Sequence, residues 1–333
     1  MENLNYEQVN TVKTEEEKFF DTSPIHAKPP KKEMSVKTKR LIFVWAMLAY
    51  PIIQWLIFFV FVNIDSIIMS FQWTKPLTNN VQFPVLTHYQ EFFKQLFVNK
   101  LPQTVNAVIN SFLVGVNDLI LVLLSVTLAY FFYKKMPGRE MFRIIFFLPS
   151  IISIVIYTVV YKYMFHSTAG PMSLLLQKIF GWKTGPDFFR DYGIIMVMIY
   201  CLWVGTGYNI LILGGAIANL PEEVMESAKL DGAKMRHELF LLVIPMIWPT
   251  IAVSILGAIT TMFTLFIQVD LLTSMGGGSK SPTIAYLINS KITGGENARS
   301  EAAAIGLTCT IVATPIVLLV KKLLDKASES FGF

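Results

Sequence analysis

The residues that could do catalytic chemistry are scattered along this chain and form no reactive set. No His-Glu-x-x-His or Gly-x-Ser-x-Gly motif is present. The glycine-rich run from Gly276 to Ser281 resembles a phosphate-binding loop, but Ser279 stands where such a loop needs glycine directly before its lysine. The four histidines lie in different predicted loops: His26, His88, His166 and His237. We therefore predict no enzyme activity, no metal site and no nucleotide site in this chain.

Polar side chains inside long apolar stretches give a stronger chemical signal. A carboxylate at mid-membrane costs about 2.5 to 3.5 kcal/mol on insertion scales, so Asp118 should face protein or water rather than lipid. Amides, hydroxyls and aromatic rings in such places either bind a polar solute or join and anchor helices. Both interpretations stay open for a set of candidate path residues: Asn110, Asn117, Asp118, Trp203, Tyr208, Asn209 and Gln268.

The elements that must hold these side chains are membrane helices. Hydrophobic residues make up 53% of the 333 residues and charged residues only 15%, with a mean hydropathy of +0.53, which fits a soluble domain poorly. The apolar runs are continuous, and each can cross about 30 Å of hydrocarbon as a helix of about 20 residues. Pro149 is expected to kink the third run. The sequence predicts an all-α integral membrane protein with six spans: residues 41–63, 107–133, 142–161, 193–217, 246–269 and 302–320.

Lysine and arginine set the predicted orientation. Eighteen of them lie in the two tails and in the loops 134–143 and 218–245, whereas ten lie between the remaining spans, on the other side. By the positive-inside rule, both termini are expected in the cytoplasm, with the chain in the plasma membrane. The net charge of +5 is spread over membrane boundaries, so we expect no nucleic-acid partner.

The two ends of the chain and its two cysteines complete the predicted organisation. Residues 1–40 are polar, contain prolines and mix both charges, so we expect a flexible cytoplasmic tail, with a second tail at 321–333. The first apolar run is too long for the core of a signal peptide and should be retained. Cys201 and Cys309 both fall inside predicted spans, where they should pack as small apolar residues.

The loop 218–245 is expected to form two short helices around one turn. Glu222 and Glu223 suit the positive end of the first helix dipole. Gly232 marks the end of that helix, because a residue with a Cβ adopts the left-handed conformation at a cost of about 1 to 2 kcal/mol. The second helix carries an apolar stripe at helical spacing: Met235, Leu239, Leu242 and Val243. A short loop cannot bury this stripe alone, so another surface should cover it.

The order of residues in this loop resembles a known signature. Glu226-Ser227-Ala228, Asp231-Gly232-Ala233 and Leu242-Val243-Ile244-Pro245 are similar to the EAA signature of binding-protein-dependent importer permeases. Three further stretches resemble the sugar-importer branch of this family, which includes the maltose and glycerol-phosphate permeases: 138–149, 266–270 and 273–278. The whole similarity covers residues 41–320.

This chain departs from the family pattern at three places. Ser227 replaces the usual second alanine, and Leu239 stands where phenylalanine is common. Residues 64–106 are too short for the extra folded domain of some maltose permeases, which leaves the cargo open.

The resemblance implies a permease subunit that imports a carbohydrate, with oligosaccharides favoured, into a prokaryotic cell. A sugar presents hydroxyls and apolar ring faces, which suit the amides and aromatic rings of the path candidates. Family resemblance also implies partners: a cytoplasmic ABC ATPase dimer that binds ATP and Mg, a second homologous permease, an extracytoplasmic solute-binding protein and membrane lipid. The residues implied to couple this chain to the ATPase are Glu226, Ser227, Ala228, Asp231, Gly232, Ala233, Leu239, Leu242 and Pro245.

Two other classes of function remain as alternatives. A secondary transporter or channel would not need a docking loop, and a carrier of that kind would show inverted repeats with broken helices, which are not identifiable in this sequence. A membrane-embedded enzyme would need a reactive set, which the sequence does not offer.

Overall fold

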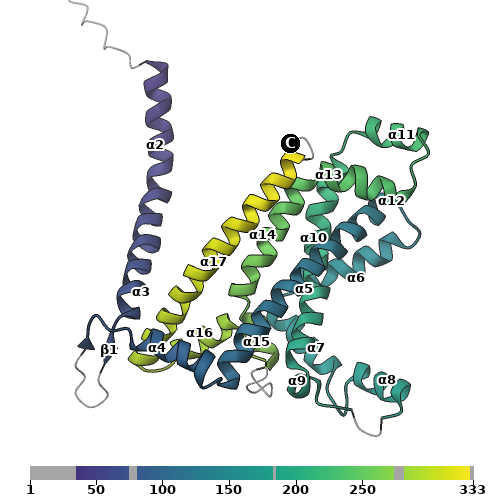
Figure 1. The fold of residues 1–333 in the computed structure, drawn as a ribbon. Coiled ribbons are helices and arrows are strands. Elements are labelled where there is room, and N and C mark those ends of the chain that lie inside the picture. The colour runs from purple at the N-terminus through teal and green to yellow at the C-terminus, as the bar shows by residue number, and fades with distance from the viewer. Residues whose placement is uncertain (1–34, 75–80, 183–184, 274–280, 331–333) are drawn as a thin grey trace, which may run out of the picture. The chain divides into compact units, whose positions relative to one another are not determined.

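Helices dominate the fold of this chain (Figure 1). The computed structural model describes residues 35–74, 81–182, 185–273 and 281–330. Most of the predicted N-terminal tail, the glycine-rich run at 274–280 and the last three residues lie outside the described residues. The chain divides into two compact units, residues 1–62 and 63–333.

The described part of the first unit is helical throughout. It contains α2 (Val36–Trp55) and the π-helical segment η1 (Leu56–Phe61), and the helix continues as α3 (Val62–Ser70). The prediction of an irregular tail as far as residue 40 is therefore wrong for residues 36–40. No proline or glycine lies between Pro30 and the first apolar run, so nothing stops the helix there.

The long helices match the length of a membrane. Four stretches are long and apolar enough to cross a bilayer by themselves: Val36–Ser70, α5 (Pro102–Tyr133), α10 (Gly193–Ala218) and α17 (Glu296–Ser330). Two further pairs pass the same test jointly but are bent: α6 (Arg139–Ile151) with α7 (Ile154–Met164), and Met235–Met246 with α14 (Trp248–Thr264). The described chain has four spans by this measure, or up to six if each bent pair is one span.

The C-terminal end differs from the prediction of a separate tail. Helix α17 continues to Ser330, beyond the predicted end of the last span at residue 320. The indole of Trp248, at the start of α14, donates a hydrogen bond to the carbonyl of Leu324 at 3.1 Å. This contact fastens the last turns of α17 to the neighbouring helix.

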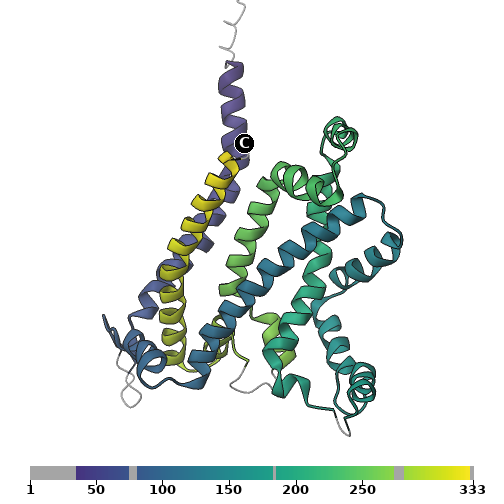
Figure 2. The ribbon, with the colours of Figure 1, turned by 45° about the vertical axis from the view of Figure 1, so that its right-hand side comes forward.

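Helix α5 is the central helix of the second unit and packs against both α10 and α14 (Figures 1 and 2). The loop 218–245, the junction between α5 and α6 and the end of α17 lie at one end of this unit, here called the loop end. The shorter elements are β1 (Trp73–Thr74), which pairs antiparallel with β2 (Val81–Gln82), α4 (Thr87–Phe93), η2 (Lys94–Val98), α8 (Pro171–Phe180), α9 (Phe188–Asp191), α15 (Ile267–Thr273) and α16 (Ile284–Ile292). In Figure 1 these elements lie at the opposite end.

The first bent pair turns by 116° just after Pro149. Proline has no N–H, so it leaves the carbonyl of Ile145, four residues back, without its helical partner. The indole Nε1 of Trp203 on α10 donates to this carbonyl at 3.4 Å. Residues 152 and 153 are not helical, and α7 starts after them. The kink predicted at Pro149 is thus a full break, which Trp203 stabilises.

The fifth predicted span, 246–269, is interrupted twice, so the prediction of one continuous helix is wrong here. The chain bends by 79° at Ile247, where Pro245 and Pro249 remove backbone donors on either side. Helix α14 then ends at Thr264, and α15 begins at Ile267. The hydroxyl of Thr283 donates to the carbonyl of Leu265 at 2.7 Å, and so satisfies the backbone at the second break.

Helices α6 and α10 approach backbone to backbone at Gly207. A Cβ at Gly207 would meet the carbonyl oxygen of Phe146, whereas a Cβ at Gly214 on the same helix would meet nothing within 4 Å. We expect Gly207→Ala to cost about 1 to 3 kcal/mol, as overpacking does. Gly214→Ala should be neutral or stabilising, because alanine favours a helix over glycine by up to about 1 kcal/mol. Thermal unfolding of the purified protein measures both, and equal midpoints would contradict close packing at Gly207.

Candidate functional site

A cavity of about 510 Å³ lies between α5, α10 and α14. This volume falls within the range of sites that bind small molecules. Asp118 of α5 is half-buried in its wall, which Thr261 of α14 also lines. Aliphatic side chains such as Val204 and Leu265 fill the wall between the polar groups. Such a wall suits a polar solute that also has apolar faces.

Four of the candidate path residues line this cavity: Asp118, Tyr208, Asn209 and Gln268. They come from three different helices, α5, α10 and α15. Tyr208 is 63% exposed, so its ring is available to a solute. Asn209 donates its Nδ2 to the carbonyl of Gly205 at 3.0 Å, which fixes the amide on its own helix. The fold therefore gathers a carboxylate, two amides and an aromatic ring in one place.

The other three candidates make structural contacts, which is the alternative that the sequence left open. Asn110 and Asn117 are buried and donate to the backbone carbonyls of Pro282 and Met198, at 2.8 and 3.3 Å. Trp203 holds the broken span through its indole. None of the three lines the cavity. Their polar atoms serve to join separate parts of the fold.

Helix α14 has a polar face that its average hydropathy does not reveal. Thr250, Ser254, Gly257 and Thr261 all line the cavity, and they follow one another at spacings of four, three and four residues. This spacing places them on one face of a helix. The signal was therefore present in the sequence, but a window that averages hydropathy passes over hydroxyl groups and glycine.

At the loop end, residues 218–245 form two helical segments around Asp231 and Gly232, as the sequence predicts. Helix α11 (Glu222–Leu230) comes first, and α12 (Met235–His237), the π-helical η3 (Glu238–Val243) and α13 (Ile244–Met246) follow. Gly232 has a φ of 72°. The N–H groups of Gly232 and Ala233 donate to the carbonyls of Lys229 and Ala228 at 3.1 and 2.9 Å. This pair of bonds is a Schellman cap, which places its left-handed residue at Gly232.

The cover expected for the apolar stripe on the second helix comes in part from other helices of this same chain. Leu239 and Val243 are buried in a core cluster with Tyr130 of α5 and Leu213 of α10. Leu242 is half-buried, whereas Met235 is exposed. The covering residues lie far away in the sequence, so the loop sequence alone could not reveal them.

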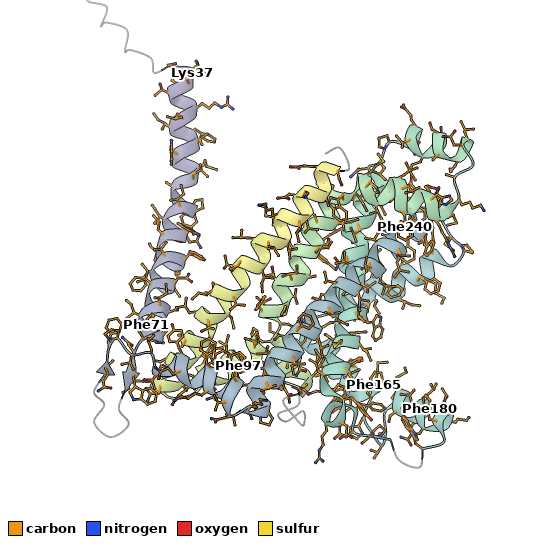
Figure 3. All side chains as sticks on the ribbon, viewed as in Figure 1. Lys37, Phe71, Phe97, Phe165, Phe180 and Phe240 are labelled. Carbon is orange, nitrogen blue, oxygen red and sulfur yellow. The ribbon has the colours of Figure 1, made fainter. Side chains whose placement is uncertain are left out.

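The exposed apolar surface of the loop combines Met235 of the stripe with three side chains outside it: Leu230, Phe240 and Leu241. Leu230 is 89% exposed, immediately before the turn at Asp231 and Gly232. Figure 3 labels Phe240 on this surface. The remaining residues of the signature divide between surface and interior: Glu226 and Ser227 are exposed, Ala233 and Pro245 are half-buried, and Ala228 is buried. Glu226 and Ser227 are therefore the most open of these residues to a docking partner.

Taken together, a helical membrane bundle with broken spans, a polar cavity and a capped loop defines a class of transport proteins. The same fold occurs in the solved structure of a bacterial alginate ABC transporter in complex with an alginate pentasaccharide-bound periplasmic protein. That structure aligns with 88% of this chain and 97% of its own, with a TM-score of 0.72 and 22% sequence identity.

Residues 121–329 match the family described as binding-protein-dependent transport system inner membrane component. The chain belongs to this family. It is therefore a multi-pass membrane permease subunit, and a transport component rather than an enzyme.

Curated relatives agree with this assignment. The multiple sugar-binding transport system permease protein MsmF of Streptococcus mutans is 25% identical over 290 residues, which cover 85% of this chain and 95% of the relative. The arabinooligosaccharides transport system permease protein AraP of Halalkalibacterium halodurans is 23% identical over 294 residues, which cover 86% of this chain and 89% of the relative.

The left-handed conformation of Gly232 provides a test of the loop. A Cβ there would meet nothing within 4 Å, so only backbone strain opposes a substitution. Gly232→Val should add about 1 to 2 kcal/mol or more, enough to weaken a docking interface about tenfold. Gly232→Asn is the matched control, because asparagine tolerates this conformation. We expect the valine variant to reach the membrane normally but to retain little ATPase on purification, with uptake lost. Normal uptake by a well-expressed valine variant would rule out a coupling role.

Proposed function

We propose that this permease subunit carries a carbohydrate, of oligosaccharide size, across the plasma membrane of a prokaryotic cell, driven by ATP hydrolysis in a separate subunit. The cavity between α5, α10 and α14 is the observation that carries this proposal. Amide and hydroxyl groups suit the hydroxyls of a sugar, and the exposed ring of Tyr208 suits the apolar face of a pyranose. The relatives that are named as sugar permeases support the same choice of cargo.

The partners follow from the family and from the exposed surface of the loop. We propose that Leu230, Met235, Phe240 and Leu241 contact a cytoplasmic ABC ATPase dimer, which holds the ATP and Mg. A second, homologous permease and an extracytoplasmic solute-binding protein complete the importer, which is surrounded by membrane lipid. The periplasmic protein bound to the alginate transporter supports the proposed solute-binding protein by analogy of fold.

The broken helices also fit the alternative of a secondary carrier, since such carriers use discontinuous helices at their binding sites. Membership of the binding-protein-dependent family favours the ATP-driven importer instead. The capped loop with its exposed apolar side chains points the same way, because a carrier without an ATPase has no use for it.

The proposed topology has six spans, each bent pair counting as one, and both termini in the cytoplasm. The excess of lysine and arginine in the two tails and in the loops 134–143 and 218–245, eighteen against ten in the remaining loops, supports this orientation. Reporter fusions after residue 333 and within the loop 218–245 should therefore both report the cytoplasmic side. A fusion within residues 162–192 should report the outer side. An external C-terminus would overturn the topology and place the loop beyond the reach of a cytoplasmic ATPase.

Uptake by a deletion strain, complemented with this chain and given labelled mono- and oligosaccharides, tests the cargo. Tyr208→Ala should raise the half-saturating concentration of the transported sugar about fivefold, because it removes about 1 kcal/mol of ring contact. Tyr163→Ala is the matched control, since Tyr163 is also exposed but does not line the cavity. Equal effects of both variants would show that Tyr208 has no specific role in sugar binding, and would contradict the cavity as the binding site. Absence of uptake of every sugar by the wild type would contradict a carbohydrate cargo.

A further inference from the structure

Lys134 and Glu238 form a buried ion pair between the end of α5 and the loop. Their side chains are only 17% and 4% exposed. The two other ion pairs in the described residues lie elsewhere: Arg139 with Glu140 on the surface, and Lys291 with Glu301 between α16 and α17. The Lys134–Glu238 pair thus joins the loop directly to a helix that lines the cavity.

Tyr130, one helical turn before Lys134 on α5, strengthens this junction. Its ring lies 5.7 Å from Nζ of Lys134, and its hydroxyl donates to the carbonyl of Met235 at 3.4 Å. The same fully buried ring belongs to the core cluster that contains Leu239 and Val243. Three kinds of contact, ionic, hydrogen-bonded and apolar, therefore hold the start of the second loop helix on α5.

Helix α5 is suited to transmit movement from this junction, whereas the chain that follows the loop is not. Between Asp118 and Lys134 the helix is unbroken and contains no proline, and at about 1.5 Å per residue it spans about 24 Å. The covalent route from the loop into α14 instead passes the 79° bend at Ile247. A displacement of the loop would reach the cavity through α5 without crossing a bend.

We propose that the Lys134–Glu238 pair, supported by Tyr130, fastens the loop to α5 so that movement imposed on the loop by the ATPase shifts the Asp118 wall of the cavity. This proposal rests on the proposed function of the chain as an ATP-driven importer. Glu238 and Lys134 act as positioning residues, because neither lines the cavity.

The test measures solute moved per ATP hydrolysed by the complete importer in proteoliposomes. Glu238→Gln keeps the shape of the side chain but removes the ion pair, and should lower this ratio at least tenfold while ATPase co-purification stays within twofold of wild type. The exchange variant Lys134→Glu with Glu238→Lys should recover the ratio to within about threefold. Glu301→Gln is the matched control, since it breaks a partly buried pair away from the loop, and should leave the ratio unchanged.

Two results would overturn the proposal. One is a wild-type ratio in Glu238→Gln. The other is an exchange variant that transports no better than Glu238→Lys alone, and this comparison holds even if a single variant accumulates poorly. If the first result came with a loss of assembly, the pair would serve stability alone. Failure of the proposed importer function can be told apart from failure of this proposal, because the wild-type complex would then show no solute transport driven by ATP hydrolysis.

Discussion

Backbone carbonyls that are released where a helix breaks must find partners inside the protein, because hydrocarbon offers none. Two of the three breaks in the spans meet that constraint in the same way. Trp203 reaches the carbonyl of Ile145 from α10, and Thr283 reaches that of Leu265. Each partner comes from a different part of the chain, so each break also ties separate segments together.

The position of the cavity follows from these ties. After the break at Leu265, the new helix α15 carries Gln268 to the wall of the cavity. The segment before α16, whose Thr283 binds the carbonyl of Leu265, is itself held by α5. There Asn110 donates to the carbonyl of Pro282, and the hydroxyl of Ser111 accepts from the N–H of Ile284. The structural asparagines and the cavity residues thus belong to one arrangement, in which the first group positions the second.

The sequence predicted the features that depend on local order. Continuous apolar runs located the four helices that are long enough to cross a membrane, and glycine chemistry located the turn at Gly232, whose φ is indeed positive. Features that depend on distant partners escaped it. The burial of Leu239 needs Tyr130, and the break at Leu265 needs Thr283, but neither relation leaves a trace in the neighbouring residues. For the same reason the seven candidate path residues looked alike until the fold separated those that line the cavity from those that join helices.

The hydroxyl groups on α14 line the polar wall of the cavity, yet they do not prevent this helix from entering the membrane during synthesis. Ser254 and Thr261 donate to the carbonyls of Thr250 and Gly257, four residues earlier on their own helix, at 3.1 and 3.0 Å. Their protons are therefore satisfied before any other helix arrives, and only oxygen lone pairs remain exposed. The segment can enter lipid as an ordinary apolar helix, because it brings few unpaired donors with it. The same residues can therefore line a polar wall in the folded bundle and still enter lipid without unpaired hydroxyl donors.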